Sequence, residues 1–145
     1  MTTIWTIGIE GATQVSFCDA LKRSGVTVLI DLRGNTKSVK PGFSGNTLAL
    51  TCEKMGINYR AGSMLRVPDE IRKKAGGEMS RLNREYKIWL SGRTEEIRHL
   101  VELAQIRSVC LLGARRHAES CTRSILAQEI GAWGFGIVHL DGAGR

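Results

Sequence analysis

The stretch VTVLIDLR, Val26 to Arg33, decides the fold class of this chain. It is a nearly continuous run of apolar, mostly β-branched residues that ends in the charged residues Asp31 and Arg33. Such a run is typical of a strand buried on both faces, as the strands of a parallel sheet are. The stretch therefore predicts a strand of a parallel sheet that helices cover on both sides.

Strand-like and helix-like segments alternate on either side of this stretch. The apolar run from Ile4 to Ile9 predicts a strand, and after the break at Gly11 the spacing of apolar residues predicts a helix that ends at Gly25. Downstream, the pattern predicts a helix over 48–55, a short strand over 57–60, a long loop with about one turn of helix over 61–77, two helices within 80–105, a strand over 108–112, a helix from about residue 119 to 130 and a strand over 136–140. Loops as long as 61–77 are commonly functional or mobile.

Alternating strands and helices predict an α/β fold. We expect an open, mostly parallel sheet of about five strands with helices on both faces, a Rossmann-like three-layer arrangement. The chain has 145 residues. That length is close to the usual domain size of ~100–150 residues. Residues 1–145 are therefore expected to form a single domain.

The composition is that of an ordinary globular domain, with 42% hydrophobic and 24% charged residues, and it excludes a disordered or fibrous chain. The 21 Lys and Arg residues exceed the 14 Asp and Glu residues, which gives a formal net charge of +7. A positive field favours anionic partners, either a small molecule or a nucleic acid. Aromatic residues make up only 6% of the chain, too few for the stacking platforms of a typical single-strand binder.

Membrane, metal and disulfide signals are missing from the sequence. No apolar run approaches the ~20 residues that cross a bilayer, and the amino terminus lacks the layout of a signal peptide, so we expect a cytoplasmic protein without a membrane partner. The four cysteines, Cys18, Cys52, Cys110 and Cys121, show no CxxC spacing. They predict neither a metal site nor a disulfide framework, and no cofactor is expected.

Candidate site residues lie in the loops that follow the predicted strands, because ligands of open parallel sheets bind beyond the carboxyl ends of the strands. The anion-binding candidates are Asp31, Arg33, Ser38, Arg115, Arg116 and Arg123, and the catalytic candidate is Cys121.

The same loops carry four motifs that together resemble one known family. The motifs are Thr6-Ile7-Gly8, Asp31-Leu32-Arg33, Ser38 with Pro41-Gly42-Phe43-Ser44, and Cys121-Thr122-Arg123-Ser124 before an amphipathic helix. In this combination the chain resembles the domain-of-unknown-function family DUF488 over nearly its whole length. The resemblance implies a fold and a site location, but no particular activity.

The chain departs from the usual pattern of that family at four polar or reactive positions. The pattern has His, Cys, Glu and His where this chain has Ile9, Gly113, Arg115 and Thr122. If the family is an enzyme family that uses those groups, the resemblance implies that this member has altered chemistry or has kept only binding.

Cys121 is the first candidate for chemistry. The helix predicted from about residue 119 places it in a first turn, where free backbone N–H groups and the helix dipole stabilise a thiolate, and three arginines are close in sequence. The alternative is a small buried residue that packs the helix on the sheet. The sequence leaves both interpretations open.

Two other pairs of residues also have a functional and a structural interpretation. Asp31 and Arg33 point at the predicted crevice, where Arg33 could bind an anion, or they form an internal ion pair. The spacing from Cys110 to Arg116 fits the C-x5-R pattern of cysteine phosphatases. The leucines that follow Cys110 look like strand interior, however, and favour a buried thiol.

Three weaker signals complete the set. The loop from Lys37 to Ser44 offers hydroxyl, ammonium and backbone N–H groups that suit a phosphate, although a solvated basic loop is the default interpretation. His117 could act as an acid or base, but an exposed loop histidine is more often inert. Tyr86 and Trp89 have the spacing of a stacking pair on a basic helix, and core packing is the commoner role of such a pair.

Two functional hypotheses follow. The first is an anion-directed enzyme with a thiol-dependent transferase or hydrolase activity on a phosphate- or sulfur-containing small molecule. An Asp-x-Arg at a strand end invites comparison with rhodanese-like proteins, at the level of the fold alone. The second is a non-catalytic domain that binds nucleic acid or a nucleotide through its basic clusters. The gathering of polar residues at strand ends favours the first.

Overall fold

The computed structural model describes residues 2–34, 40–61 and 64–144. These residues form the strands β1 (Thr3–Gly8), β2 (Val28–Asp31), β3 (Asn58–Arg60), β4 (Val109–Gly113) and β5 (Gly136–His139). The helices are α1 (Gln14–Ser24), α2 (Gly45–Lys54), α3 (Asp69–Ala75), α4 (Met79–Ser91), α5 (Thr94–Ile106) and α6 (Arg123–Gly131), with a 3-10 turn, η1 (Ala118–Ser120), before α6. The alternation of strands and helices confirms the α/β fold class.

The strands of the described residues form one five-stranded sheet in the order β3-β2-β4-β1-β5, and every neighbouring pair is parallel. The register sets Gly8 of β1 beside Gly113 of β4, and Asp31 of β2 beside Leu112 of β4. The carboxyl ends of β1, β2 and β4 therefore meet at one edge of the sheet. The stretch from Val26 to Arg33 supplies β2, an inner strand.

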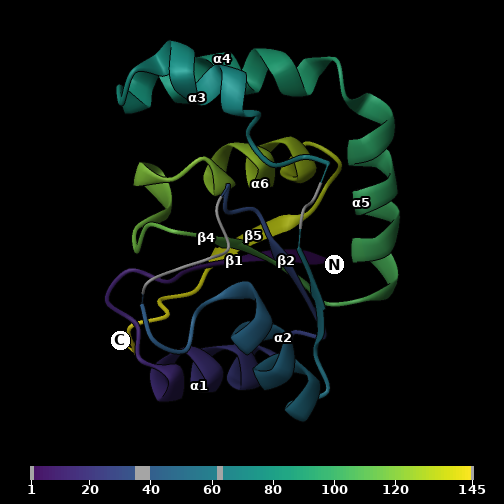
Figure 1. The fold of residues 1–145 in the computed structure, drawn as a ribbon. Coiled ribbons are helices and arrows are strands. Elements are labelled where there is room, and N and C mark those ends of the chain that lie inside the picture. Colours follow the sequence, from purple (N-terminus) through teal and green to yellow (C-terminus); the bar gives the residue numbers. More distant parts are fainter. Residues whose placement is uncertain (1, 35–39, 62–63, 145) are drawn as a thin grey trace.

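Helices cover both faces of the sheet (Figure 1). α1 and α2 lie on one face, α6 lies on the other, α3 and α4 lie beyond α6, and α5 flanks the sheet at the side. The side chains of β2 alternate between the two faces of the sheet, so each face packs against its own layer of helices. Leu29 packs in an apolar cluster with residues of α1 and α2, whereas Val28 and Ile30 pack in a second cluster with residues of α4, α5 and α6.

The order of the strands makes the loop after β4 diverge from the loops after its two neighbouring strands. From β1 through β2 to β3 the chain moves toward one edge of the sheet, and from β3 it returns through β4 to β5. Because parallel crossovers are right-handed, the helices of the outward path and of the return path cover opposite faces. The loop after β4 therefore leaves toward α6, while the loops after β1 and β2 leave toward α1 and α2. Ligands of such sheets bind where the loops diverge in this way.

Two helix boundaries differ from the sequence-based expectation. The predicted long loop contains the seven-residue helix α3, whose inward residues Ile71 and Ala75 are too few to give a periodic signal. The helix predicted from about residue 119 starts at Arg123, because the N–H of Cys121 closes the η1 turn on the carbonyl of Ala118. Cys121 itself is extended, with φ −137° and ψ 140°, and precedes α6 instead of lying in its first turn.

The loop after β4 lies so close to the end of β1 that only glycine fits at position 8. A Cβ atom on Gly8 would lie 1.8 Å from the carbonyl oxygen of Arg115. Since the clashing atom belongs to the backbone, no side-chain movement relieves the overlap. The contact sets how deeply the β4 loop sits at the edge of the sheet.

Replacing Gly8 with alanine should push this loop away from β1. We expect Gly8→Ala to lower the free energy of unfolding by about 3 kcal/mol, as severe overpacking does. The matched control is Gly92→Ala at the end of α4, where an added Cβ meets nothing nearer than 3.6 Å. That change should stay within about 0.5 kcal/mol of wild type. Urea denaturation measures both, and a Gly8→Ala protein as stable as the control would contradict the close contact.

Candidate functional site

A cavity of about 510 Å³ opens at the carboxyl ends of β2 and β4. Its walls come from the segments that follow these strands, from η1 and the start of α6, and from α3 and α4. The lining residues are Leu32, Arg33, Gly34, Asp69, Arg72, Met79, Leu82, Gly113, Ala114, Arg115, Ser120, Cys121, Thr122 and Arg123. The cavity thus lies at the point where the loops after β2 and β4 diverge.

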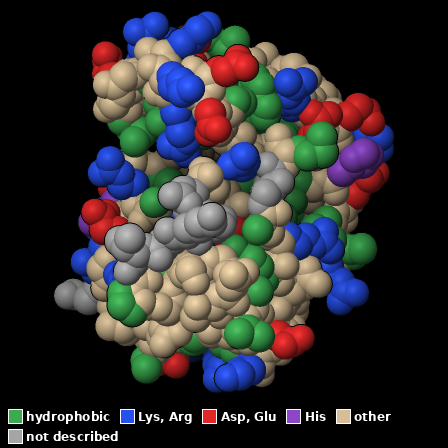
Figure 2. Space-filling view, viewed as in Figure 1, with side chains coloured by type: hydrophobic (Ala, Val, Ile, Leu, Met, Phe, Trp, Pro, Cys, Tyr) green, Lys and Arg blue, Asp and Glu red, His purple; other side chains and the backbone are tan. Residues whose placement is uncertain are grey.

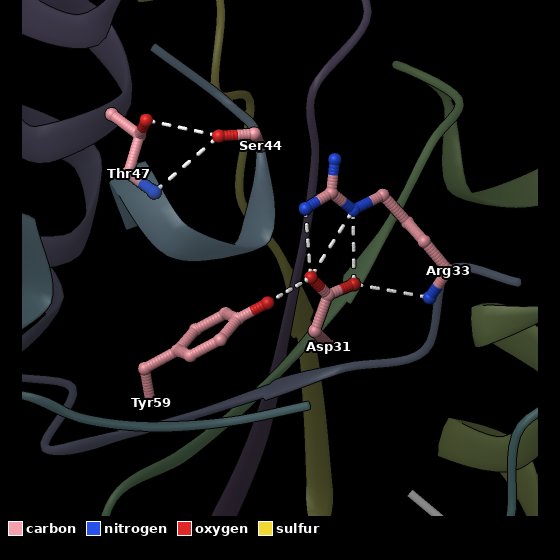
Figure 3. Close-up of polar contacts among 5 residues, drawn as sticks. All are labelled: Asp31, Arg33, Ser44, Thr47 and Tyr59. Carbon is pink, nitrogen blue, oxygen red and sulfur yellow. Dashed lines mark hydrogen bonds and ion pairs between the residues drawn. The ribbon is translucent and has the colours of Figure 1, made fainter. Parts of the chain in front are cut away.

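Asp31 and Arg33 form a buried ion pair at the end of β2 (Figure 3). The Asp31 carboxylate accepts hydrogen bonds from the backbone N–H and Nε of Arg33, each at 3.0 Å, and from its Nη2 at 2.8 Å. It also accepts one from the Tyr59 hydroxyl at 2.6 Å. The internal ion pair is therefore confirmed. Nη1 of Arg33 has no hydrogen-bond partner within the part of the chain that the structure describes, and Arg33 lines the cavity.

The electrostatics of this cluster keep Arg33 charged. Burial disfavours the guanidinium cation, but the hydrogen bond and the charge of Asp31 outweigh it, so the pKa of Arg33 is raised. Burial, followed by the hydrogen bond to Asp31, raises the pKa of Tyr59, so the phenol keeps the proton that it donates. A permanent cation with one uncommitted N–H edge stands at the cavity.

Arg123 is almost completely buried, with 1% of its surface exposed. Its guanidinium donates to Thr6 Oγ1 at 3.1 Å and to the carbonyl oxygens of Arg115 and Arg116 at 2.7 and 3.1 Å. Among the described residues no carboxylate pairs with it. Neutral oxygens compensate this buried cation, and in return it holds the β4 loop against β1.

His139 of β5 extends the Arg123 network. Its Nδ1 lies 2.6 Å from Thr6 Oγ1. In the tautomer protonated on Nε2, the Thr6 hydroxyl donates its proton to Nδ1 while its oxygen accepts from Arg123. Partial burial, and then the charge of Arg123, lower the pKa of His139, which favours the neutral ring.

Cys121 lies in the cavity wall and is 6% exposed. Its sulfur packs on Gly113, where an added Cβ would lie 2.5 Å from Sγ and 3.1 Å from Cδ of Arg123. Gly113 thus leaves the room that the thiol occupies. The backbone N–H groups of Thr122 and Arg123 have no hydrogen-bond partner among the described residues, and they belong to the positive end of α6.

Arg115, Arg72 and Asp69 bring further charge to the cavity lining, and all three are exposed. The Arg72 guanidinium lies against the backbone of Gly34, where an added Cβ would meet its Nε at 3.4 Å. Sequence reasoning placed Arg115 at the candidate site but placed neither residue of α3 there. The only signal for them was the unusual length of the predicted loop over 61–77, because contacts between α3 and the strand ends leave no local pattern.

Other sequence candidates lie apart from the cavity. The guanidinium of Arg116 pairs with Asp141 at 3.1 Å, and Arg116 does not line the cavity. His117 is exposed and does not line it either. Ser38, with the 37–39 part of the basic loop over 37–44, lies outside the described residues.

Two alternatives from the sequence are settled by burial. Cys110 is fully buried inside β4, and burial strongly raises the pKa of its thiol, so the residue is strand interior and not a phosphatase nucleophile.

Tyr86 is buried and donates to the carbonyl of Leu65. Its ring stacks on Trp89 with centroids 6.0 Å apart, and the guanidinium of Arg93 covers Trp89 at 4.7 Å. Tyr86 therefore belongs to the core.

A family model described as "Domain of unknown function DUF488" matches residues 13–130. The chain belongs to this family. The matched range contains every residue that lines the cavity, whereas Thr6 and His139 fall outside it. No curated protein and no solved structure matches the chain. Because the DUF488 description assigns no activity, function has to be argued from the cavity.

The described residues contain neither a metal-binding cluster nor a membrane-spanning helix. Within residues 2–34, 40–61 and 64–144, no group of three or more His, Cys, Asp and Glu side chains is placed to hold a metal ion. In the same residues no helix has the length and apolar character needed to span a bilayer.

The lowered pKa of His139 makes the stability of the protein depend on pH. The folded protein holds the pKa of His139 below its ordinary value of 6.5, so the unfolded chain binds a proton more readily. Stability should therefore fall as the pH drops below about 6.5. In His139→Asn, an amide can accept the Thr6 hydrogen bond without titrating, and the thermal midpoint should fall less than in wild type between pH 7.5 and 5.5.

His117→Asn is the matched control for this measurement, because it removes an exposed imidazole that has no contact with Thr6. It should retain the wild-type loss of thermal stability. Identical pH profiles for wild type and His139→Asn would contradict a lowered pKa of His139.

Proposed function

We propose that the cavity binds an anionic small molecule that contains phosphate or sulfur, and that Cys121 supplies a thiol for a transferase or hydrolase reaction on it. The observation that carries the proposal is the convergence in one cavity of Arg33, Arg72, Arg115 and Cys121, which come from three separate segments of the chain. A shared cavity between diverging strand loops is the usual ligand site of such sheets.

The charges of the lining support an anion. Arg33 offers Nη1, the edge of its guanidinium that Asp31 leaves uncommitted. Arg72 and Arg115 bring exposed guanidinium groups from the facing wall and the β4 loop. Arginine binds carboxylate, phosphate and sulfonate groups through paired N–H donors. The buried guanidinium of Arg123 adds positive potential to the cavity wall, although its own donors are largely engaged by Thr6 and the loop carbonyls.

The surroundings of Cys121 support chemistry at the thiol. A thiolate is the reactive form of cysteine. The thiol has the Arg123 side chain on one side and the first N–H groups of α6 next to it in the chain. The same N–H groups suit the oxyanion that develops when a thiolate attacks a carbonyl, phosphoryl or sulfur centre.

Nucleic-acid binding is the second candidate, and a basic surface favours it. Lys and Arg side chains gather over α3 and α4 in the upper part of the molecule, with acidic side chains among them (Figure 2). The exposed basic residues there are Arg72, Lys73, Lys74, Arg81, Arg84 and Lys87. Exposed Glu70 and Glu78 lie in the same segment and would repel phosphates, so the cavity is the stronger candidate.

Alkylation of Cys121 tests the cavity as an anion site. Inorganic phosphate bound beside the thiol should slow the reaction of Cys121 with iodoacetamide, followed residue by residue by mass spectrometry of the folded protein. Cys18 on α1 is the internal control, because it is half-buried on the opposite face of the sheet and should be unaffected. Arg72→Ala with Arg115→Ala should raise the phosphate concentration needed for half protection about tenfold or more, which corresponds to about 1.4 kcal/mol.

The control variant is Arg81→Ala with Arg84→Ala, which removes the same charge from the basic surface of α4 and should leave protection unchanged. Protection lost equally in both double variants would point to general electrostatics and against a cavity site. A Cys121 whose alkylation ignores phosphate at any concentration would overturn the proposal, and tight DNA or RNA binding that weakens steeply with salt would favour the second candidate.

A further inference from the structure

The cavity lining combines charges of both signs beside a thiol. Arg33, Arg72 and Arg115 provide guanidinium groups, and Asp69 provides a carboxylate in the same wall as Arg72. No ion pair of Asp69 is recorded among the described residues. A simple phosphate or sulfate matches the cations and leaves Asp69 facing an anion. A ligand that carries several carboxylates and an ammonium group matches both signs.

Arg33 offers a further contact for a ligand at this place. Its side chain is only 5% exposed, and its Nη1 edge has no hydrogen-bond partner among the described residues. Nη1 is not one of the buried atoms without a partner, so this edge is accessible from the cavity and can donate to a ligand there. Since Arg33 and Cys121 line the same cavity, a ligand carboxylate on Nη1 would place the rest of the ligand near the thiol.

The thiol itself is isolated from the other described cysteines. Cys110 and Cys52 are buried in the apolar cluster on the α1 and α2 face, and Cys18 lies on α1. Cys121 lines the cavity and lies next to the start of α6. A disulfide formed between Cys121 and a small molecule therefore has no described thiol beside it that could displace the small molecule, and the adduct would persist until another thiol enters from solution.

We propose that Cys121 is a site of mixed-disulfide formation with small, anionic, amino-acid-type thiols, for which the cavity provides the carboxylate and ammonium contacts. This inference rests on the proposed anion site and names its substrate class. The volume of about 510 Å³ falls within the ~300–1,000 Å³ of typical small-molecule sites and admits a short peptide thiol.

The chemical step is an exchange that needs no further oxidant. The Cys121 thiol loses its proton, and the thiolate attacks one sulfur of a low-molecular-weight disulfide R–S–S–R. The new bond joins Sγ to R–S, the old S–S bond breaks, and the electron pair leaves on the second R–S⁻, which takes up a proton to become R–SH. One disulfide is consumed and one is formed, so atoms and electrons balance.

Oxidised glutathione is the probe, because each half carries two carboxylates and one ammonium group. The folded protein is incubated with it, the intact mass is followed over time, and the modified residue is identified by peptide mapping. We expect a single glutathionyl adduct on Cys121, absent from Cys121→Ser.

Cystamine, which is cationic, and 2-hydroxyethyl disulfide, which is neutral, serve as comparison disulfides. The rate of each disulfide with the protein is divided by its rate with free N-acetylcysteine, which removes the intrinsic reactivity of the disulfide. The normalised rate should be about tenfold higher for oxidised glutathione than for cystamine.

Exposed arginines supply variants that should fold normally. Arg72→Ala with Arg115→Ala should lower the normalised rate with oxidised glutathione about tenfold and leave the rate with 2-hydroxyethyl disulfide nearly unchanged. Arg81→Ala with Arg84→Ala is the charge-matched control and should match wild type. Faster modification of Cys18, or equal normalised rates for the three disulfides, would overturn the inference. If phosphate still protects Cys121 from iodoacetamide in that case, the anion site stands and only the assigned substrate class fails.

Discussion

The arrangement of the strand ends depends on one buried cation. The Arg123 guanidinium reaches from the first residue of α6 to Thr6 on β1 and to two carbonyl groups of the loop after β4. Burying a cation without a carboxylate partner is costly, and only a full set of well-placed oxygens compensates it. The backbone of the loop must therefore keep one conformation. Gly8 permits the close approach that this requires, because any side chain there would collide with the Arg115 carbonyl.

The contrast between Arg123 and Arg33 explains how one edge of the sheet has a fixed backbone and still keeps a hydrogen-bond donor for an anion. The guanidinium of Arg123 donates its hydrogen bonds to Thr6 and to the carbonyl groups of the β4 loop. Its contribution is therefore structural and electrostatic. Arg33 is held by Asp31 through Nε and Nη2, which leaves its Nη1 edge toward the cavity. An ion pair that fixes a guanidinium while one edge stays free is preorganised for an anion, since little side-chain entropy is lost on binding. Cys121 lies in the same wall, beside Gly113.

Particular residues show how far sequence reasoning reached. The two-sided burial of 26–33 and the alternation of periodic segments are local patterns, and they predicted the parallel sheet and the location of the candidate site at its strand ends. Cys110 was correctly interpreted as strand interior because leucines follow it. The start of α6 was misplaced, because the η1 turn depends on a hydrogen bond from Cys121 to Ala118 that no periodicity reveals. α3, with few inward residues, was predicted only as about one turn of helix within a long loop, and neither Asp69 nor Arg72 was placed at the candidate site.

The sequence by itself determined the fold class, the family and the edge of the sheet where polar residues gather, because these follow from periodicity and motif along the chain. Only the tertiary structure decided which charged groups are available. Arg123 and Arg116 were equal candidates with Arg33 and Arg115, yet the first is bonded to Thr6, 117 positions away, and the second is paired with Asp141. His139 and Thr6 are 133 positions apart. Whether a guanidinium is engaged or free depends on such distant partners, and spacing along the chain holds no information about them.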